Sequence, residues 1–259
     1  MPKFLKINKK NILIALGVFL FVSFLFFANL LSSFLLIKTD KTTYSLSSNP
    51  LTFYTISFDK ALSEKSAQSL ATDYQKLGGS GYVIEHEEYF YILSSSYLNK
   101  NDAQLVQNSI KTNQNIETTM IELKANSINF NISLDSEEKK VFQKALNAFE
   151  NAYKLLFDIA ISLDTLVYNE VSARLAINSA FSTINTIASD FDILFGEVEE
   201  ENIKTLNSYL KLLTQTMQKL CSGLTISKEQ TLSSLIKYRY CEIIDLSIKL
   251  SNELNTNKN

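Results

Sequence analysis

The stretch YFYILSSSYLNKNDA, residues 89–103, places aromatic and aliphatic residues directly before three serines and an asparagine-rich segment. Aromatic and β-branched residues in a short run are typical of a β-strand, and asparagine is a favoured residue at the N-terminus of a helix. Further on, Ala103, Val106 and Ile110 recur at helical spacing. This stretch therefore predicts a strand that leads into a helix.

The sequence on either side continues the alternation of strand and helix signals. The expected elements are a strand at 51–58, a helix at 63–77 that stops at two glycines, a hairpin of strands at 81–86 and 88–94, a helix at 99–112, and a strand at 115–123. The order strand, helix, strand, strand, helix, strand predicts a ferredoxin-like βαββαβ module at 51–124, with one sheet and two helices on one of its faces.

From about residue 135 the pattern becomes purely helical. Asp135 and Glu138 have the spacing of a capping box. Apolar residues then recur at intervals of three and four in stripes that end near Gly196 and Gly223. Each stripe forms one apolar face, which predicts an antiparallel bundle of three or four helices at 135–255. An extended coiled coil is the alternative. The fold class expected for the whole chain is α+β with a single transmembrane helix.

That transmembrane helix is expected near the N-terminus. Residues 12–37 contain no charge, and 26 residues of helix are long enough to span a hydrocarbon core of about 30 Å. Residues 1–11 carry four lysines and no acidic residue, which favours a cytoplasmic tail. A cleaved signal peptide is the alternative. With the tail in the cytoplasm, we expect everything from Lys38 onward to lie outside the membrane. Residues 38–50 are polar and end at a proline, so we expect a linker there.

The composition of the extracytoplasmic part argues against several functions. From Lys38 onward the chain has 21 basic and 27 acidic residues, a net charge of −6, which disfavours nucleic acid or an anionic lipid surface as a partner. Cys221 and Cys241 form no disulfide framework, and His86 is the single histidine. The three serines at 94–96 lack a nucleophile-elbow motif. We therefore expect no metal, no cofactor and no enzymatic activity.

The spacing of residues 54–123 resembles that of the SPOR domain, the peptidoglycan-binding module of bacterial division and sporulation proteins. In the first half of this region, the end of the first strand matches the family pattern, as does an alanine six residues further on. The helix that follows also matches, with a large residue and then a glycine. The second half repeats the strand end and the alanine. Asp59 and Ser95 stand where the family often has glycine. The matching positions are Ile56, Phe58, Ala61, Ala67, Tyr74, Gly78, Tyr82, Val83 and Ile84, then Phe90, Ile92, Ser94, Ser95, Tyr97 and Ala103.

This resemblance implies a membrane-anchored protein that binds peptidoglycan glycan strands through the sheet face opposite the two helices. If Ile56, Phe58, Phe90 and Ile92 point toward the helices, alternation places their neighbours on the other face. Hydroxyl groups and aromatic rings on an open face suit a neutral sugar chain. The candidate glycan contacts are Thr55, Ser57, Tyr82, Tyr89, Tyr91, Leu93 and Thr119.

A different function remains open for the helical region. Amphipathic helices with apolar surface to spare serve as docking sites for other proteins, so the chain is alternatively a non-catalytic scaffold whose residues 135–255 bind a partner protein. An exposed apolar patch on the bundle would favour this second hypothesis.

Overall fold

A computed structural model describes residues 41–223 and 231–256 of the chain. It divides the chain into two units, Met1–Thr42 and Thr43–Asn259. The predicted cytoplasmic tail and membrane segment, residues 1–37, lie outside the described residues. Within the described ranges, no helix has both the length and the apolar character needed to cross a membrane.

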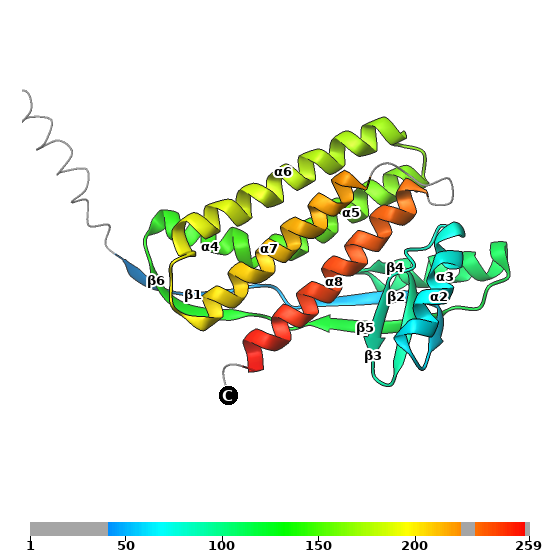
Figure 1. The fold of residues 1–259 in the computed structure, drawn as a ribbon, viewed down its shortest axis with the longest axis horizontal. Coiled ribbons are helices and arrows are strands. Elements are labelled where there is room, and N and C mark those ends of the chain that lie inside the picture. Colours follow the sequence, from blue (N-terminus) through cyan, green and yellow to red (C-terminus); the bar gives the residue numbers. More distant parts are fainter. Residues whose placement is uncertain (1–40, 224–230, 257–259) are drawn as a thin grey trace, which may run out of the picture. The chain divides into compact units, whose positions relative to one another are not determined.

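The described residues form an α+β fold in which strands and helices alternate first and helices alone follow (Figure 1). The elements in chain order are β1 (Thr42–Ser47), β2 (Leu51–Ala61), α2 (Glu64–Lys76), β3 (Val83–His86), β4 (Tyr89–Tyr97), α3 (Lys100–Gln114), β5 (Thr119–Ala125), β6 (Asn129–Leu134), α4 (Ser136–Leu146), α5 (Ala148–Asp164), α6 (Glu170–Phe195), α7 (Glu201–Ser222) and α8 (Leu232–Thr256).

The four-stranded sheet has the order β3-β4-β2-β5, and every neighbouring pair is antiparallel. The long strand β2 lies at the centre, where Thr55 pairs with Ser96 of β4 and with Ile121 of β5. This is the order that a split βαβ arrangement requires. The strand pairing predicted from the alternation of signals is therefore confirmed for this sheet.

Helices α2 and α3 cover one face of the sheet. Both helices begin where the sequence predicts, because Ser63 and Asn99 cap them with side-chain oxygens that accept backbone N–H groups. Alanines at the inner faces, Ala67 and Ala103, are fully buried and allow the helices to approach closely. The sheet residues on this face are the ones that alternation predicts: Ile56, Phe58, Phe90 and Ile92.

The C-terminal part is a bundle of five described helices, α4 to α8, rather than three or four. The capping box predicted at Asp135 and Glu138 is present and begins α4. The first expected helix is divided in two, since α4 ends and α5 begins at Asn147. In the bundle, α5 packs along α8 and α6 packs along α7 (Figure 1).

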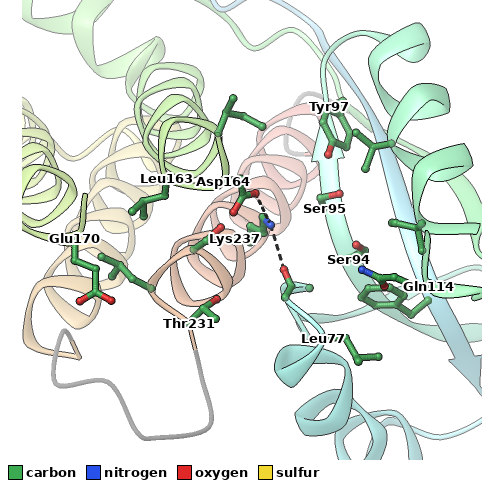
Figure 2. A pocket seen from close by; sticks show the side chains of 18 residues that line it. Leu77, Ser94, Ser95, Tyr97, Gln114, Leu163, Asp164, Glu170, Thr231 and Lys237 are labelled. Carbon is green, nitrogen blue, oxygen red and sulfur yellow. Dashed lines mark hydrogen bonds and ion pairs between the residues drawn. The ribbon is translucent and has the colours of Figure 1, made fainter. Parts of the chain in front are cut away.

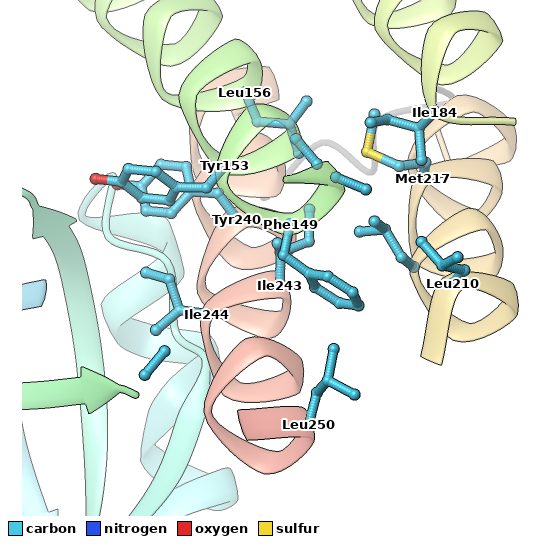
Figure 3. Close-up of a cluster of buried hydrophobic side chains, with 14 of the residues drawn as sticks. Phe149, Tyr153, Leu156, Ile184, Leu210, Met217, Tyr240, Ile243, Ile244 and Leu250 are labelled. Atoms are coloured by element: carbon cyan, nitrogen blue, oxygen red, sulfur yellow. The ribbon is translucent and has the colours of Figure 1, made fainter. Parts of the chain in front are cut away.

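The sheet and the bundle share one hydrophobic core instead of forming two separate domains. The ring of Tyr153 on α5 lies 5.2 Å from the ring of Phe53 on β2 and 5.6 Å from that of Tyr240 on α8. Its hydroxyl donates a hydrogen bond to the backbone oxygen of Ser96 at 2.9 Å. Figure 3 shows Tyr153, Tyr240 and Ile244 on the side of the helices that faces the strands. One buried cluster thus runs from β2 and β4 into the bundle.

The segment expected to be a linker is partly folded. Residues Thr42–Ser47 form β1, which pairs with β6 in a second, two-stranded sheet. Ser48 continues the contact by donating its backbone N–H to the oxygen of Ile128 at 2.9 Å. Leu46 is buried in the core. The expectation of a linker at 38–50 is therefore wrong for β1, whose partner strand lies about ninety residues away and gives no local signal.

Cys221 and Cys241 are both free thiols. Cys241 lies in the core of the bundle, and its burial raises the pKa of the thiol to about 12. Burial also raises the pKa of Cys221 on α7. Because the thiolate is the reactive form of cysteine, the burial of Cys241 disfavours nucleophilic chemistry at that thiol.

Candidate functional site

The sheet face that was predicted to bind glycan is covered by the bundle. Thr55, Ser57 and Leu93 are fully buried, and Tyr91 is buried as well. The covering elements are α5 and α8, which pack against β4 and β5. The expectation of an open face is therefore wrong. Alternation establishes which side of the sheet a residue faces but does not establish what packs on that side.

The hydroxyl groups on this covered face are satisfied within the protein. Thr55 and Ser96 share a hydrogen bond of 2.8 Å between their side-chain oxygens, across the β2–β4 pair. The Ser57 hydroxyl donates to the backbone oxygen of Ile92 at 2.9 Å, at a position where the β2–β4 register shifts. These two hydroxyls therefore stabilise the central strands and are not free to bind a sugar.

The remaining three candidates lie at the margins of the sheet. Tyr82 is partly buried, and its hydroxyl donates to a carboxylate oxygen of Asp245 on α8 at 2.7 Å. Burial, followed by the negative charge of Asp245, raises the pKa of Tyr82 well above its ordinary value. Tyr89 is partly exposed, with the Lys60 ammonium 3.8 Å from its ring centroid. Thr119 is exposed. Tyr89 and Thr119 thus keep accessible side chains, whereas Tyr82 connects β3 to α8.

A cavity of about 620 Å³ opens beside the covered face, where the turn after α2, strand β4 and the ends of α5 and α8 meet (Figure 2). The ammonium group of Lys237 on α8 donates to the backbone oxygen of Gly78 at 3.1 Å and forms an ion pair with Asp164 at 2.8 Å. Ser94 and Ser95 of β4 supply hydroxyls to the cavity. The apolar walls are formed by Phe58, Leu77, Val106, Ile110, Ile161 and Leu163.

Three charged residues line this cavity, Lys237, Asp164 and Glu170, and Glu170 forms an ion pair with Arg174 on the same helix. The positive charge of Lys237 is balanced by Asp164, which is 2.8 Å away. Ser95 is 3% exposed, and its hydroxyl lies beside that of Tyr97, which also lines the cavity. Because the charged side chains of the lining are already ion-paired, a neutral ligand with hydrogen-bonding groups suits the cavity better than an ion does.

A second candidate surface lies on α6, the helix on the side of the bundle away from the four-stranded sheet (Figure 1). Its inner face is the expected core stripe, which includes Ile177, Ile184 and Phe191. Seven exposed residues on the opposite side also recur at intervals of three and four, and we call them the outer stripe. The outer stripe consists of Val171, Leu175, Asn178, Ser182, Thr186, Ser189 and Ile193.

The outer stripe is unusual because it contains no charged residue and ends in exposed apolar side chains. Val171 and Leu175 are each 67% exposed at one end, and Ile193 is 77% exposed at the other. In the middle, the hydroxyl of Thr186 donates to the backbone oxygen of Ser182 at 2.9 Å. That hydroxyl is already satisfied within the helix, so covering this part of the stripe does not break a protein hydrogen bond.

Comparison with known proteins identifies no relative, since no protein family, curated protein or solved structure matches this chain. Within residues 41–223 and 231–256, no three His, Cys, Asp or Glu side chains gather where they would hold a metal ion. The surfaces of the described residues are therefore the guide to function. The sequence contained a signal for the outer stripe, namely the second three-and-four pattern on α6, but its serines and threonines resemble an ordinary solvated helix face.

Proposed function

We propose that this chain is a non-catalytic, membrane-anchored protein of the bacterial cell surface whose helical bundle docks a partner protein through the outer stripe of α6. The observation that carries the proposal is the exposure of Val171, Leu175 and Ile193 on one uncharged helix face. Exposed apolar groups rimmed by polar ones are typical of protein interaction sites.

The apolar residues of the outer stripe predict weak binding unless the partner adds contacts of its own. Full burial of a valine, leucine or isoleucine side chain stabilises a complex by about 1.5–3 kcal/mol. Three such residues are offset by the loss of translational and rotational freedom, about 4–15 kcal/mol. A partner helix laid along the stripe would match its shape, since helices present ridges at the same three-and-four spacing.

The proposed location at the membrane is supported by the sequence of residues 1–37. An uncharged segment of 26 residues follows a short tail with four lysines, which orients the tail toward the cytoplasm and the described residues toward the outside. The bacterial origin is supported by the resemblance of residues 54–123 to the SPOR domain.

The docking proposal is tested by photo-crosslinking in the cells that make the protein. A photo-reactive phenylalanine analogue in place of Leu175 is expected to give one discrete cross-linked product. The matched control is Leu105 on α3, which is 68% exposed and therefore as accessible as Leu175. Identical products from both positions, or no product from Leu175, would contradict docking at α6.

A second candidate function is glycan binding at the cavity instead of at the covered sheet face. The observation that favours it is a cavity lined by the hydroxyls of Ser94, Ser95 and Tyr97 and by apolar walls, with its charged side chains ion-paired, since sugars offer both hydrogen-bonding groups and apolar ring faces. Tyr89 and Thr119 would then be peripheral to the glycan, and the other five predicted contacts would have structural roles.

Retention of the full chain in detergent on purified peptidoglycan sacculi tests this second candidate. Gln114 lies at the cavity, and its replacement by alanine is expected to weaken retention about two- to tenfold, the effect of one lost hydrogen bond. The neighbouring exposed Asn113 is the control for the same change. Absence of retention, or an equal loss in both variants, would rule out glycan binding at the cavity.

A further inference from the structure

We infer that the open edge of strand β3 binds an extended, basic segment of a partner protein, which adds to the four-stranded sheet as a fifth strand. β3 is an outermost strand of that sheet (Figure 1). An outermost strand presents backbone N–H and C=O groups with which another chain can pair. This edge is separate from the outer stripe of α6, so the inference goes beyond the proposed docking function and does not depend on it.

The backbone of β3 has two residues whose hydrogen-bonding groups point away from the sheet. Leu93 of β4 donates its N–H to the oxygen of Tyr82 at 2.8 Å. Bonded and non-bonded positions alternate along an antiparallel pair, so Ile84 is the next residue bonded to β4, whereas the backbone groups of Val83 and Glu85 face outward. Among residues 41–223 and 231–256, no hydrogen-bond partner reaches these outward groups. Two N–H and two C=O groups are thus available to an added strand.

A groove follows this edge of the sheet. A cavity of about 500 Å³ is lined by Val83 and Glu64 on the α2 side of the sheet and by Ile84 and Ile248 on the α8 side. Because both sides contribute to its lining, the cavity lies along the edge of the strand and not on one face. A second cavity, of about 360 Å³, shares Ile84 and Ile248 with the first and extends to Leu123 of β5. We call the two cavities together the β3 groove.

The β3 groove carries a negative charge. Its lining includes five carboxylates and two lysines, a net charge of −3. Both lysines form ion pairs inside the groove, Lys249 with Asp245 at 2.8 Å and Lys124 with Glu122 at 2.9 Å. In the part of the chain that the structure describes, no lysine or arginine pairs with the other three carboxylates, which are Glu64, Glu85 and Glu87. A partner segment with positive charges therefore complements the groove.

The geometry of strand addition predicts the pattern of the partner segment. Side chains of an added strand alternate between the two sides of the sheet. On the α2 side they meet the carboxylates of Glu64 and Glu85, to which lysine or arginine donates charge-assisted hydrogen bonds. On the α8 side they meet Ile84 and Ile248, which favour an apolar side chain. The expected ligand is an extended segment in which basic and apolar residues alternate.

Binding of synthetic peptides to the full chain in detergent tests the inference. The probe is a short fluorescein-labelled peptide of alternating lysine and valine, and fluorescence anisotropy measures its binding. Only one edge of an added strand faces β3, so N-methylation of one alternate set of backbone nitrogens, those of the lysines or those of the valines, is expected to weaken binding about tenfold. Methylation of the other set is the matched control and is expected to have little effect. Both methylated peptides keep the charge of the probe.

Reversal of one charge tests the same groove from the side of the protein. Glu85→Lys is expected to weaken binding roughly five- to tenfold, because an attraction is replaced by a repulsion. Glu197→Lys is the matched control, since Glu197 is an exposed carboxylate in the turn after α6, and we expect it to leave binding unchanged. Absence of binding, an equal loss in both variants, or an equal effect of the two methylation patterns would overturn strand addition at β3.

Discussion

Replacement of Tyr153 by alanine is expected to destabilise the sheet and the bundle together by about 3–5 kcal/mol, the usual loss for a large buried aromatic residue. Tyr153 is 2% exposed and lies between the two parts of the fold. Its ring contacts Phe53 of β2 and Tyr240 of α8, and its hydroxyl bonds to Ser96 of β4. The loss is measured as the change in the free energy of unfolding in urea.

Tyr153→Phe is the control for this first prediction. It keeps the ring contacts and removes only the hydrogen bond to the backbone oxygen of Ser96, so we expect a loss of about 0.5–1.5 kcal/mol. If the alanine variant lost no more than the phenylalanine variant, the ring of Tyr153 would not connect the sheet to the bundle.

Removal of the bundle, residues 135–259, is expected to prevent the remaining chain from folding. Without α5 and α8 the face that carries Phe53, Leu93, Ile121 and Leu123 would be exposed to water, and all four residues are buried in the intact chain. Exposure of one such side chain costs about 1.5–3 kcal/mol, whereas a domain is stable by only about 5–15 kcal/mol in total.

The measurement for this truncation is the amide proton NMR spectrum of residues 41–134, with residues 41–259 as the control. We expect poorly dispersed signals and aggregation from the truncated chain. A well-dispersed spectrum would show that the sheet and its two helices fold alone, and it would return the predicted glycan face to solvent.

Local patterns in the sequence predicted the sheet well. The alternation of Ile56 and Phe58 with their neighbours identified the face that packs on α2 and α3, and Ser63 and Asn99 marked the helix starts. These features depend on neighbours within a few residues, so the sequence contains them directly. The capping box at Asp135 is a further local feature of this kind.

The packing of α5 and α8 on the second face of the sheet was not predicted, although strand β4 carries a partial signal of it. Every residue of β4 from Tyr91 to Tyr97 is buried, and a strand that is buried on both faces is expected to be continuously apolar. The three serines at 94–96 hid this pattern, because small hydroxyl residues look exposed in a sequence. Thr55 shows how such hydroxyls are accommodated, since it pairs with Ser96 across the strands.

The candidate surface on α6 was also not evident from the sequence. The core stripe with Ile177 and Ile184 was predicted from its spacing. The outer stripe has the same spacing, but whether Leu175 and Ile193 are exposed depends on which helices surround α6. That information comes from the packing of α4, α5 and α7 against the other side of the helix.

We conclude that the sheet and the bundle are one folding unit. The sheet face that packs on the bundle then belongs to the core, and the exposed surface of the bundle remains available for function. Pulsed hydrogen exchange with mass spectrometry, carried out across a urea titration, tests this claim most directly. Peptides from β2 and β4 are expected to lose protection at the same urea concentration as peptides from α5 and α8, since Tyr153 and its neighbours connect them. Loss of protection in the strands at lower urea, while α5 and α8 remain protected, would contradict it.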